Sequence, residues 1–203
     1  ATLAVSFAPG RDGVQVTATF QKLTARLSQP MGGAQSASES DIQGNLVFTL
    51  DRKGKGTVVS APQLKGAVAQ LANPLTVVHE FFPRLPGGPV SAGSTWTDTI
   101  QYEISTPEGT TASSTVTTYT LQGDTVVNGA SLVKITYQGK ANVTGGATTE
   151  GMEVVQVFAG DVSGTYLWDA ARAVFVAHEA KGDMTGTVEV PAAGVPPMPM
   201  TVS

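Results

Sequence analysis

The sequence contains no cysteine, which excludes disulfide bridges, thiolate metal sites and a cysteine nucleophile. It has only 2 histidines, His79 and His178, and they do not form a His-Glu-x-x-His motif. Each histidine precedes a glutamate, but neighbouring residues on a strand point to opposite faces, so neither pair forms a joint site. These absences predict no resident metal, no cofactor and no histidine-based catalytic centre.

Charge is also scarce, because Asp, Glu, Lys and Arg make up 14% of the chain against about a quarter in an average globular protein. The net charge is −4, and the basic residues are scattered singly, which argues against a nucleic-acid partner. No apolar run approaches the ~20 residues of a membrane helix, so any membrane contact is expected to be peripheral. Asp98, Glu103 and Glu153 alternate with threonine-rich sequence, and we expect them on a solvated strand face. The sequence therefore predicts a protein that is not an enzyme.

What replaces the missing charge is Thr, Ser, Gly and Gln, a composition typical of secreted β-proteins. Apolar and polar residues alternate along most of the chain, and this period of two predicts strands. Trp96, Ile100, Tyr102 and Ile104, for example, share one register with polar residues between them. Glycine-containing pairs such as Gly123-Asp124 are expected to be turns.

One passage, residues 62–82, has helical spacing. Ser60 and Gln63 have the form of a capping box, and Asn73-Pro74 ends or kinks the run. The apolar residues that recur at helical intervals are Leu64, Val68, Leu71, Leu75, Val78 and Phe82. The sequence therefore predicts a short helical segment before Pro83.

No internal repeat and no obvious linker divides the chain, so we predict one β domain over residues 1–190. Its expected fold is mainly β, a curved antiparallel sheet or open half-barrel with the helical segment packed against it. Residues 30–41 are rich in Gly, Ser and Ala without periodicity, which predicts a flexible loop. Residues 191–203 are expected to form an extended, Pro/Met-rich tail.

The segment from Phe81 to Asp98, FFPRLPGGPVSAGSTWTD, resembles a Pro…Val…Gly-Ser-Thr-Trp stretch of bacterial exported proteins. Those proteins are similar to the lipoprotein-localisation carriers and related half-barrel lipid binders. Tyr166-Leu167-Trp168-Asp169, followed by Arg172, resembles their late hairpin. The resemblance implies an open β-barrel whose concave side is covered by the helical segment. It also implies a bacterial protein of the periplasm or outer surface. The first residues, Ala1 to Val5, have the pattern of a strand, so we expect a processed N-terminus.

Large aromatic residues are the candidates for an apolar binding site. Trp96 and Trp168 either anchor a sheet core or form an aromatic wall for an apolar ligand or carbohydrate. Two adjacent aromatics, Phe81 and Phe82, cannot both face one helix stripe, so one of them is expected to reach a cavity or a partner. The residues proposed to line such a cavity are Leu71, Val78, Phe81, Phe82 and Trp96.

The tail offers a candidate partner site, because extended Pro/Met segments suit docking along a groove and methionine adapts to irregular surfaces. The residues concerned are Pro196, Pro197, Met198, Pro199 and Met200.

Three functions remain open. The first is a non-catalytic extracytoplasmic interaction or scaffold subunit, such as an extrinsic component of a membrane-associated complex, with a protein partner bound through the tail. The alternative is a periplasmic carrier of lipid or another apolar ligand. The third, a hydrolase of cell-surface polymer, would require a convergent pair of buried acids.

Overall fold

The computed structural model describes residues 2–10, 13–29, 33–65, 68, 74–106, 109–149, 152–172, 174–194 and 196–202. The chain is mainly β, with a curved, unclosed antiparallel sheet and a short helix, which confirms the predicted fold class. The contacts form two compact units, Ala1–Leu85 and Pro86–Ser203, and the single β domain over residues 1–190 stays a prediction. The division falls in the Pro/Gly connector, and each sheet pairs strands from one unit alone. We call them the N-terminal unit and the C-terminal unit.

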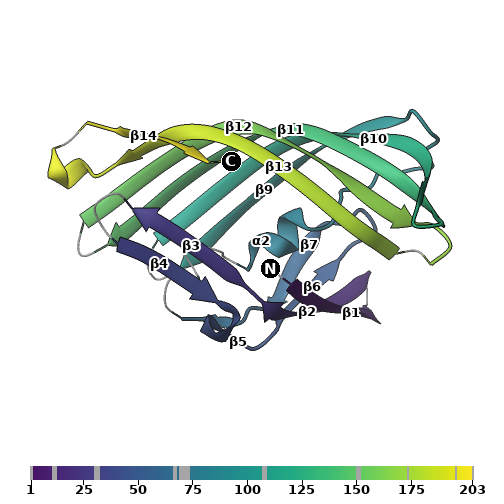
Figure 1. Ribbon diagram of the computed structural model, residues 1–203, viewed down its shortest axis with the longest axis horizontal. Helices are drawn as coiled ribbons and strands as arrows, with labels where there is room; N and C mark the ends of the chain where they lie inside the picture. Colours follow the sequence, from purple (N-terminus) through teal and green to yellow (C-terminus); the bar gives the residue numbers. More distant parts are fainter. Residues whose placement is uncertain are drawn as a thin grey trace. The chain divides into compact units, whose positions relative to one another are not determined.

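The N-terminal unit contains a four-stranded antiparallel sheet in the order β1-β2-β6-β7 (Figure 1). Its strands are β1 (Thr2–Pro9), β2 (Val14–Lys22), β6 (Leu46–Leu50) and β7 (Gly56–Ser60). Alternation places Val16 opposite Phe48 and Ala18 opposite Leu46, and all four side chains are fully buried. These pairs form the core of the sheet.

The helix α2 (Thr76–Glu80) packs against β7 through Val78, which is 1% exposed. A Cβ on Gly56 would lie 2.6 Å from Val78 Cγ1, so glycine is what allows this close approach. The helical prediction for residues 62–82 is confirmed at its C-terminal end, where α2 lies. It is wrong at its N-terminal end, because Gln63–Leu64 is strand β8, paired with β5 (Ile42–Gln43). Residues 69–73, which include the predicted Leu71, lie outside the described residues.

After the helix, residues 83–85 lie against the hairpin turn that follows β6. Asp51 Oδ1 accepts hydrogen bonds from the backbone N–H groups of Lys53 and Lys55, each 2.8 Å, and so holds the turn. The Arg84 guanidinium is buried, and its Nη1 donates to the Gly54 carbonyl oxygen at 2.5 Å. The carbonyl of Lys53 accepts from the Leu85 N–H at 2.8 Å, so the chain leaving the helix is bound to this turn.

Residues 30–41, predicted to be a flexible loop, contain ordered structure where they are described. Strand β4 (Gly33–Ser38) pairs with β3 (Thr24–Gln29), and a 3-10 turn follows at Glu39–Asp41. Asp41 accepts a hydrogen bond from the Ser38 N–H at 2.8 Å. The composition lacks an alternating pattern, so the pairing with β3 is what makes this segment a strand.

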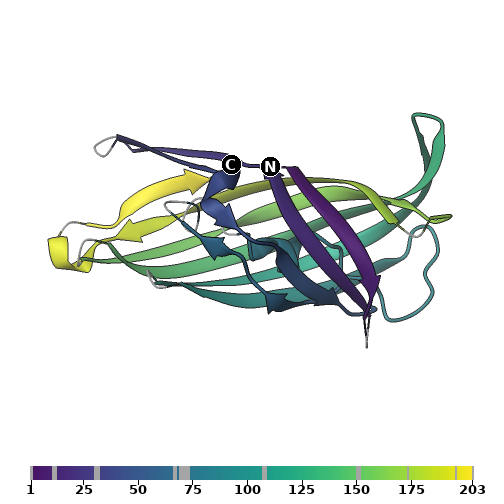
Figure 2. The same ribbon diagram turned by 90° about the horizontal axis from the view of Figure 1, so that it is seen from below.

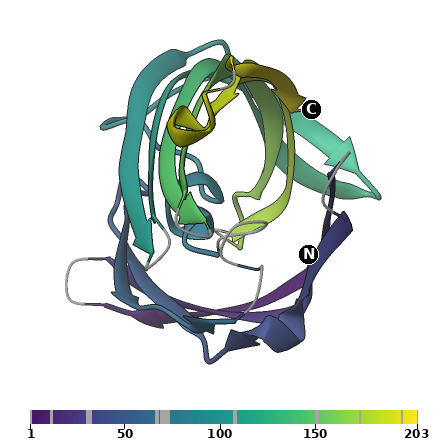
Figure 3. The same ribbon diagram turned by 90° about the vertical axis from the view of Figure 1, so that its left-hand side faces the viewer.

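The C-terminal unit is a six-stranded antiparallel sheet in the order β14-β13-β12-β11-β10-β9. It follows the chain as a meander and curves without closing (Figures 1 and 3). Its strands are β9 (Thr95–Thr106), β10 (Gly109–Val127), β11 (Ala130–Thr149), β12 (Met152–Asp169), β13 (Val174–Glu189) and β14 (Met198–Val202).

These strands are longer than predicted, reaching 20 residues in β11, because they continue through glycines that resembled turn signals. Gly123-Asp124 is not a turn: a β-bulge lies between Leu121 and Gly123, and β10 continues to Asn128-Gly129. That pair, with φ of 52° and 81°, has the left-handed conformations of a tight hairpin turn. Figure 2 shows the end of this hairpin bending away from the other strands.

Candidate ligand-binding face

One face of the six-stranded sheet carries every tryptophan, tyrosine and phenylalanine of the C-terminal unit. Residues directly opposite each other in an antiparallel pair share a face, so the register places these side chains together. The aromatic members are Trp96, Tyr102, Tyr119, Tyr137, Phe158, Tyr166, Trp168 and Phe175. We call this side of the sheet the apolar face.

The apolar face is the more buried side of the sheet. Ile100, Ile104, Ile135 and Phe158 are between 6% and 8% exposed, whereas Val157, which projects from the opposite side, is 47% exposed. Side chains converge on the concave side of a curved sheet and cover one another, so we assign the apolar face to the concave side.

The opposite, outer face carries the charge. Lys140 and Asp161 are cross-strand neighbours there and form an ion pair at 2.5 Å, with side chains 74% and 69% exposed. Such an exposed pair contributes at most about 1 kcal/mol to stability. Other charged residues of the outer face are Glu103, Glu153, Glu179, Lys181, Asp183 and Glu189.

At one end of the apolar face the rings form a continuous cluster from β9 to β13. Trp96 stacks on Tyr119, with ring centroids 5.5 Å apart, and Tyr166 stacks on His178 at 4.0 Å. Tyr137 connects the two stacks, because its ring lies 5.8 Å from Tyr119 and 5.4 Å from Tyr166. Tyr119 and Tyr166 are buried, and the rings at the margins are half-buried. Aromatic pairs of this kind contribute about 0.5–1.5 kcal/mol each beyond the area they bury.

The link between Tyr137 and His178 depends on a glycine. Tyr137 lies on β11 and His178 on β13, so the tyrosine must cross β12 to place its Oη 3.0 Å from His178 Nε2. It crosses at Gly164, directly opposite Tyr137, where a Cβ would lie 2.6 Å from ring atoms Cε1 and Cζ. The contact between Tyr137 and His178, whose strands are separated by β12, therefore requires glycine at position 164.

The middle of the apolar face carries mostly small side chains, with Met184 at the β13 end of one row. One row of cross-strand neighbours runs Thr117, Gly139, Val162, Gly182, and the next runs Thr115, Ala141, Gly160, Met184. A Cβ on Gly139 would meet the Val116 carbonyl, and one on Gly160 would meet the Asp183 carbonyl. These glycines therefore permit the strands to bend and leave the centre of the face without bulky groups.

Three ionisable groups other than tyrosine lie on the paired part of this face between β9 and β13, namely Asp98, His178 and Asp124, which is opposite Val133. The prediction that Asp98 belongs to a solvated face is wrong, because Asp98 is opposite the buried Thr117 and is half-buried. Asp98 is two residues from both Trp96 and Ile100, and this alternation already indicated that it shares their face. Glu103 and Glu153 are exposed, as predicted.

Burial lowers the pKa of His178 below its ordinary value, so its ring favours the neutral form.

The predicted cavity residues separate into different parts of the chain. Val78 and Phe82 are buried in the N-terminal unit, where the Phe82 ring lies 6.0 Å from Phe48. Phe81 is 38% exposed, and its ring lies 5.1 Å from that of Phe82. Trp96 is half-buried on the apolar face of the C-terminal unit.

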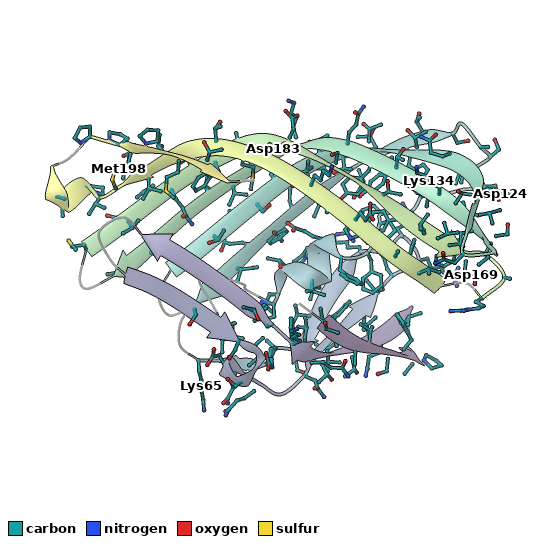
Figure 4. The ribbon with its side chains drawn as sticks, in the orientation of Figure 1. Lys65, Asp124, Lys134, Asp169, Asp183 and Met198 are labelled. Atoms are coloured by element: carbon teal, nitrogen blue, oxygen red, sulfur yellow. The ribbon has the colours of Figure 1, made fainter. Side chains whose placement is uncertain are left out.

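The Pro/Met-rich tail, predicted to be extended, begins with a 3-10 turn at Pro191–Ala193, and its last described part is a strand of the sheet. Strand β14 pairs with β13, with Met200 opposite Gly186 and Pro199 opposite Thr187. Met198 and Met200 are 48% and 44% exposed. In Figure 4, Met198 and Asp169 lie toward opposite ends of the C-terminal unit. The proline suits an edge strand, because it has no N–H to contribute to a further ladder.

Sequence reasoning did not bring together Tyr119, Tyr137, Tyr166 and His178. Each occupies an apolar position in an alternating pattern, but the pattern does not reveal which strands are neighbours. The signal that could have found them is the meander itself, since aligning consecutive hairpins places these residues in adjacent rows.

Among the described residues, no group of three or more His, Asp or Glu side chains is arranged to hold a metal ion. In the same part of the chain, no helix has the length and apolar character needed to span a membrane. Comparisons with protein-family models, with curated proteins and with solved structures found no match.

Replacing Gly164 with alanine is expected to destabilise the C-terminal unit by about 1–3 kcal/mol, since the new methyl group overlaps the Tyr137 ring. Urea denaturation followed by tryptophan fluorescence measures this, because Trp96 and Trp168 both lie in this unit. Gly146→Ala is the control on the same sheet, since nothing lies within 4 Å of the added Cβ. Equal stability of the two variants would contradict the role given to Gly164.

The stability of the C-terminal unit is expected to decrease as the pH falls from 7.5 to 5.5. Because the pKa of folded His178 is lowered, the unfolded chain takes up the proton first as the pH falls below about 6.5. The loss is at most about 1.4 kcal/mol per pH unit. His178→Gln should flatten the slope measured by urea denaturation with tryptophan fluorescence. The pKa of the Glu39 carboxyl is also lowered, so its protonation affects stability only below this pH range. An identical slope in the variant would exclude His178 as the cause.

Proposed function

We propose that the protein binds an apolar ligand with an extended hydrocarbon portion, such as a lipid acyl chain, on the apolar face of the C-terminal unit. The observation that carries the proposal is the concentration of all the aromatic side chains of this unit on one side of a long, curved, unclosed sheet.

The dimensions of the face support an elongated ligand. A strand rises about 3.3 Å per residue, so the 18 residues of β12 extend for roughly 60 Å before curvature. The centre of the face carries Gly139, Gly160 and Gly182 at positions where leucine or phenylalanine would be bulky. The aromatic cluster at one end offers a wall against which an apolar chain can pack.

The distribution of ionisable groups supports binding without catalysis. Asp98 on β9 and Asp124 on β10 are four and three strand spacings from His178 on β13, which is about 19 Å and about 14 Å along the sheet. A general acid and base must both reach the reacting atoms, and this separation does not favour it. A non-catalytic carrier or binder, working outside the cytoplasm as the composition suggests, is therefore the function that we propose.

Val162 provides a direct test, because it lies on the apolar face between Gly139 and Gly182 and is half-buried. Val162→Glu should weaken binding of dansylaminoundecanoic acid at least tenfold, since a carboxylate in an apolar site is costly to desolvate. Val157→Glu introduces the same charge on the outer face of the same strand and should leave affinity unchanged. Energy transfer from tryptophan to the dansyl group measures both.

Val162→Thr, which keeps the shape of the side chain, is the companion variant in case Val162→Glu unfolds, and should weaken binding severalfold. Circular dichroism and thermal unfolding confirm that each variant is folded. If the wild-type protein does not bind the probe, and mass spectrometry of organic extracts recovers no lipid from protein purified from its source, the proposal is refuted. Equal losses in the Val162 and Val157 variants would also refute it.

A scaffold role is the second candidate, favoured by the exposed methionines Met198 and Met200 on β14. We propose that a protein partner would bind there, burying both side chains at about 1–2 kcal/mol each. Met198→Ser combined with Met200→Ser should then shift the native complex in source extracts to the size of the free protein. Met152→Ser, at a methionine that is 44% exposed elsewhere, is the control. An unchanged complex with the double variant contradicts this candidate.

A further inference from the structure

Two methionines of β14 lie next to each other on the apolar face. Met200 is opposite Gly186 and Met198 is opposite Val188, and directly opposite residues of an antiparallel pair share a face. Residues two positions apart in a strand are separated by roughly 7 Å and project in the same direction. The two side chains are 44% and 48% exposed, so solutes can reach both thioether groups.

The residue between the two methionines restricts the backbone that carries them. Pro199 has its φ fixed near about −65° by its ring, and its side chain projects to the outer face. The chain between Met198 and Met200 therefore has little freedom to rotate one thioether away from the other. A methionine side chain has three rotatable bonds, so the two sulfur atoms can approach one ion without a change in the backbone.

An aromatic ring flanks the methionine pair. Phe158 is opposite Gly186 on β12, and Met200 is opposite the same glycine on β14. A Cβ on Gly186 would lie 2.7 Å from Phe158 Cδ1, so the ring extends over the glycine and no side chain separates it from Met200. A cation held by Met200 would be attracted by such a ring.

The atoms around the pair favour a soft ion. In the two rows that contain the methionines, the described residues of β12 and β13 are Phe158, Gly186, Gln156 and Val188, and none of them carries a carboxylate or an imidazole. A Cβ on Gly145 would lie 2.5 Å from Gln156 Nε2, so this amide extends toward β11 and away from β14. Thioether sulfur selects Cu(I), whereas Mg²⁺ and Ca²⁺ require oxygen ligands.

We propose that Met198 and Met200 bind one soft monovalent metal ion of the Cu(I) class through their two Sδ atoms. Met184 does not complete the site, because it is opposite Val202, four residues or roughly 13 Å along the strand from Met198. The site is therefore two-coordinate, and a closed-shell ion has no preference from its d-electrons against this geometry. This inference rests neither on a bound apolar ligand nor on a protein partner.

Titration calorimetry of the full chain with Ag⁺, in nitrate buffer without chloride, tests the site. Ag⁺ has the charge and closed shell of Cu(I) and is stable in air. The wild-type chain should bind one Ag⁺ ion, and Met198→Leu and Met200→Leu should each weaken binding at least tenfold, because leucine keeps the apolar bulk without the sulfur. Met152→Leu, at a methionine that is 44% exposed elsewhere, is the matched control and should change the affinity less than about twofold.

Nuclear magnetic resonance of the methionine methyl groups provides a second measurement that needs only the wild-type fold. Of the 5 methionine signals, Ag⁺ should shift the two that disappear from the spectra of Met198→Leu and Met200→Leu. The proposal is overturned if the wild-type chain binds no Ag⁺ up to about 1 mM. It is also overturned if Met152→Leu weakens binding as much as Met200→Leu does, or if the Met198→Leu/Met200→Leu double variant binds Ag⁺ like the wild type.

Discussion

The feature on which the rest of the structure depends is the unbroken antiparallel register from β9 to β14. Directly opposite residues project from the same face, so the alternation within one strand is transferred to the next across the whole sheet. Trp96, Tyr119 and Tyr137 become neighbours in this way, although more than 40 residues of sequence separate the first from the last. A slip of one residue in any pair would move the next strand's aromatics to the charged face.

Glycine converts this register into a curved surface. Strands of 16 to 20 residues cannot stay flat, and Gly139, Gly160 and Gly164 stand where a side chain would collide with the adjacent strand. The same absence of a side chain lets Tyr137 reach His178 across β12. Curvature and a polar contact inside an apolar cluster thus have one physical cause.

The two proposals use different parts of the same sheet. Ligand binding depends on its apolar face, where desolvated aromatic and small side chains dominate. Partner binding, the second candidate, depends on its edge, where the exposed Met198 and Met200 lie on β14. The short β14 connects them, because it covers one part of the β13 edge with Met198 and Met200 and leaves the remainder open. Whether an edge is covered is decided by where a late segment of chain returns to the sheet.

Local patterns in the sequence determined the β class, the turn at residues 51–56, the helical turn before Pro83 and the common register of Trp96 and Ile100. Each rests on residues a few positions apart. The tertiary structure decided the remainder: that β4 and β8 are strands, that β10 continues through Gly123, that Asp98 lies among apolar side chains, and that the tail is an edge strand. A glycine at a turn and a glycine in a bent strand look alike locally. Only the partner strand, distant in sequence, supplies the hydrogen bonds and contacts that distinguish them.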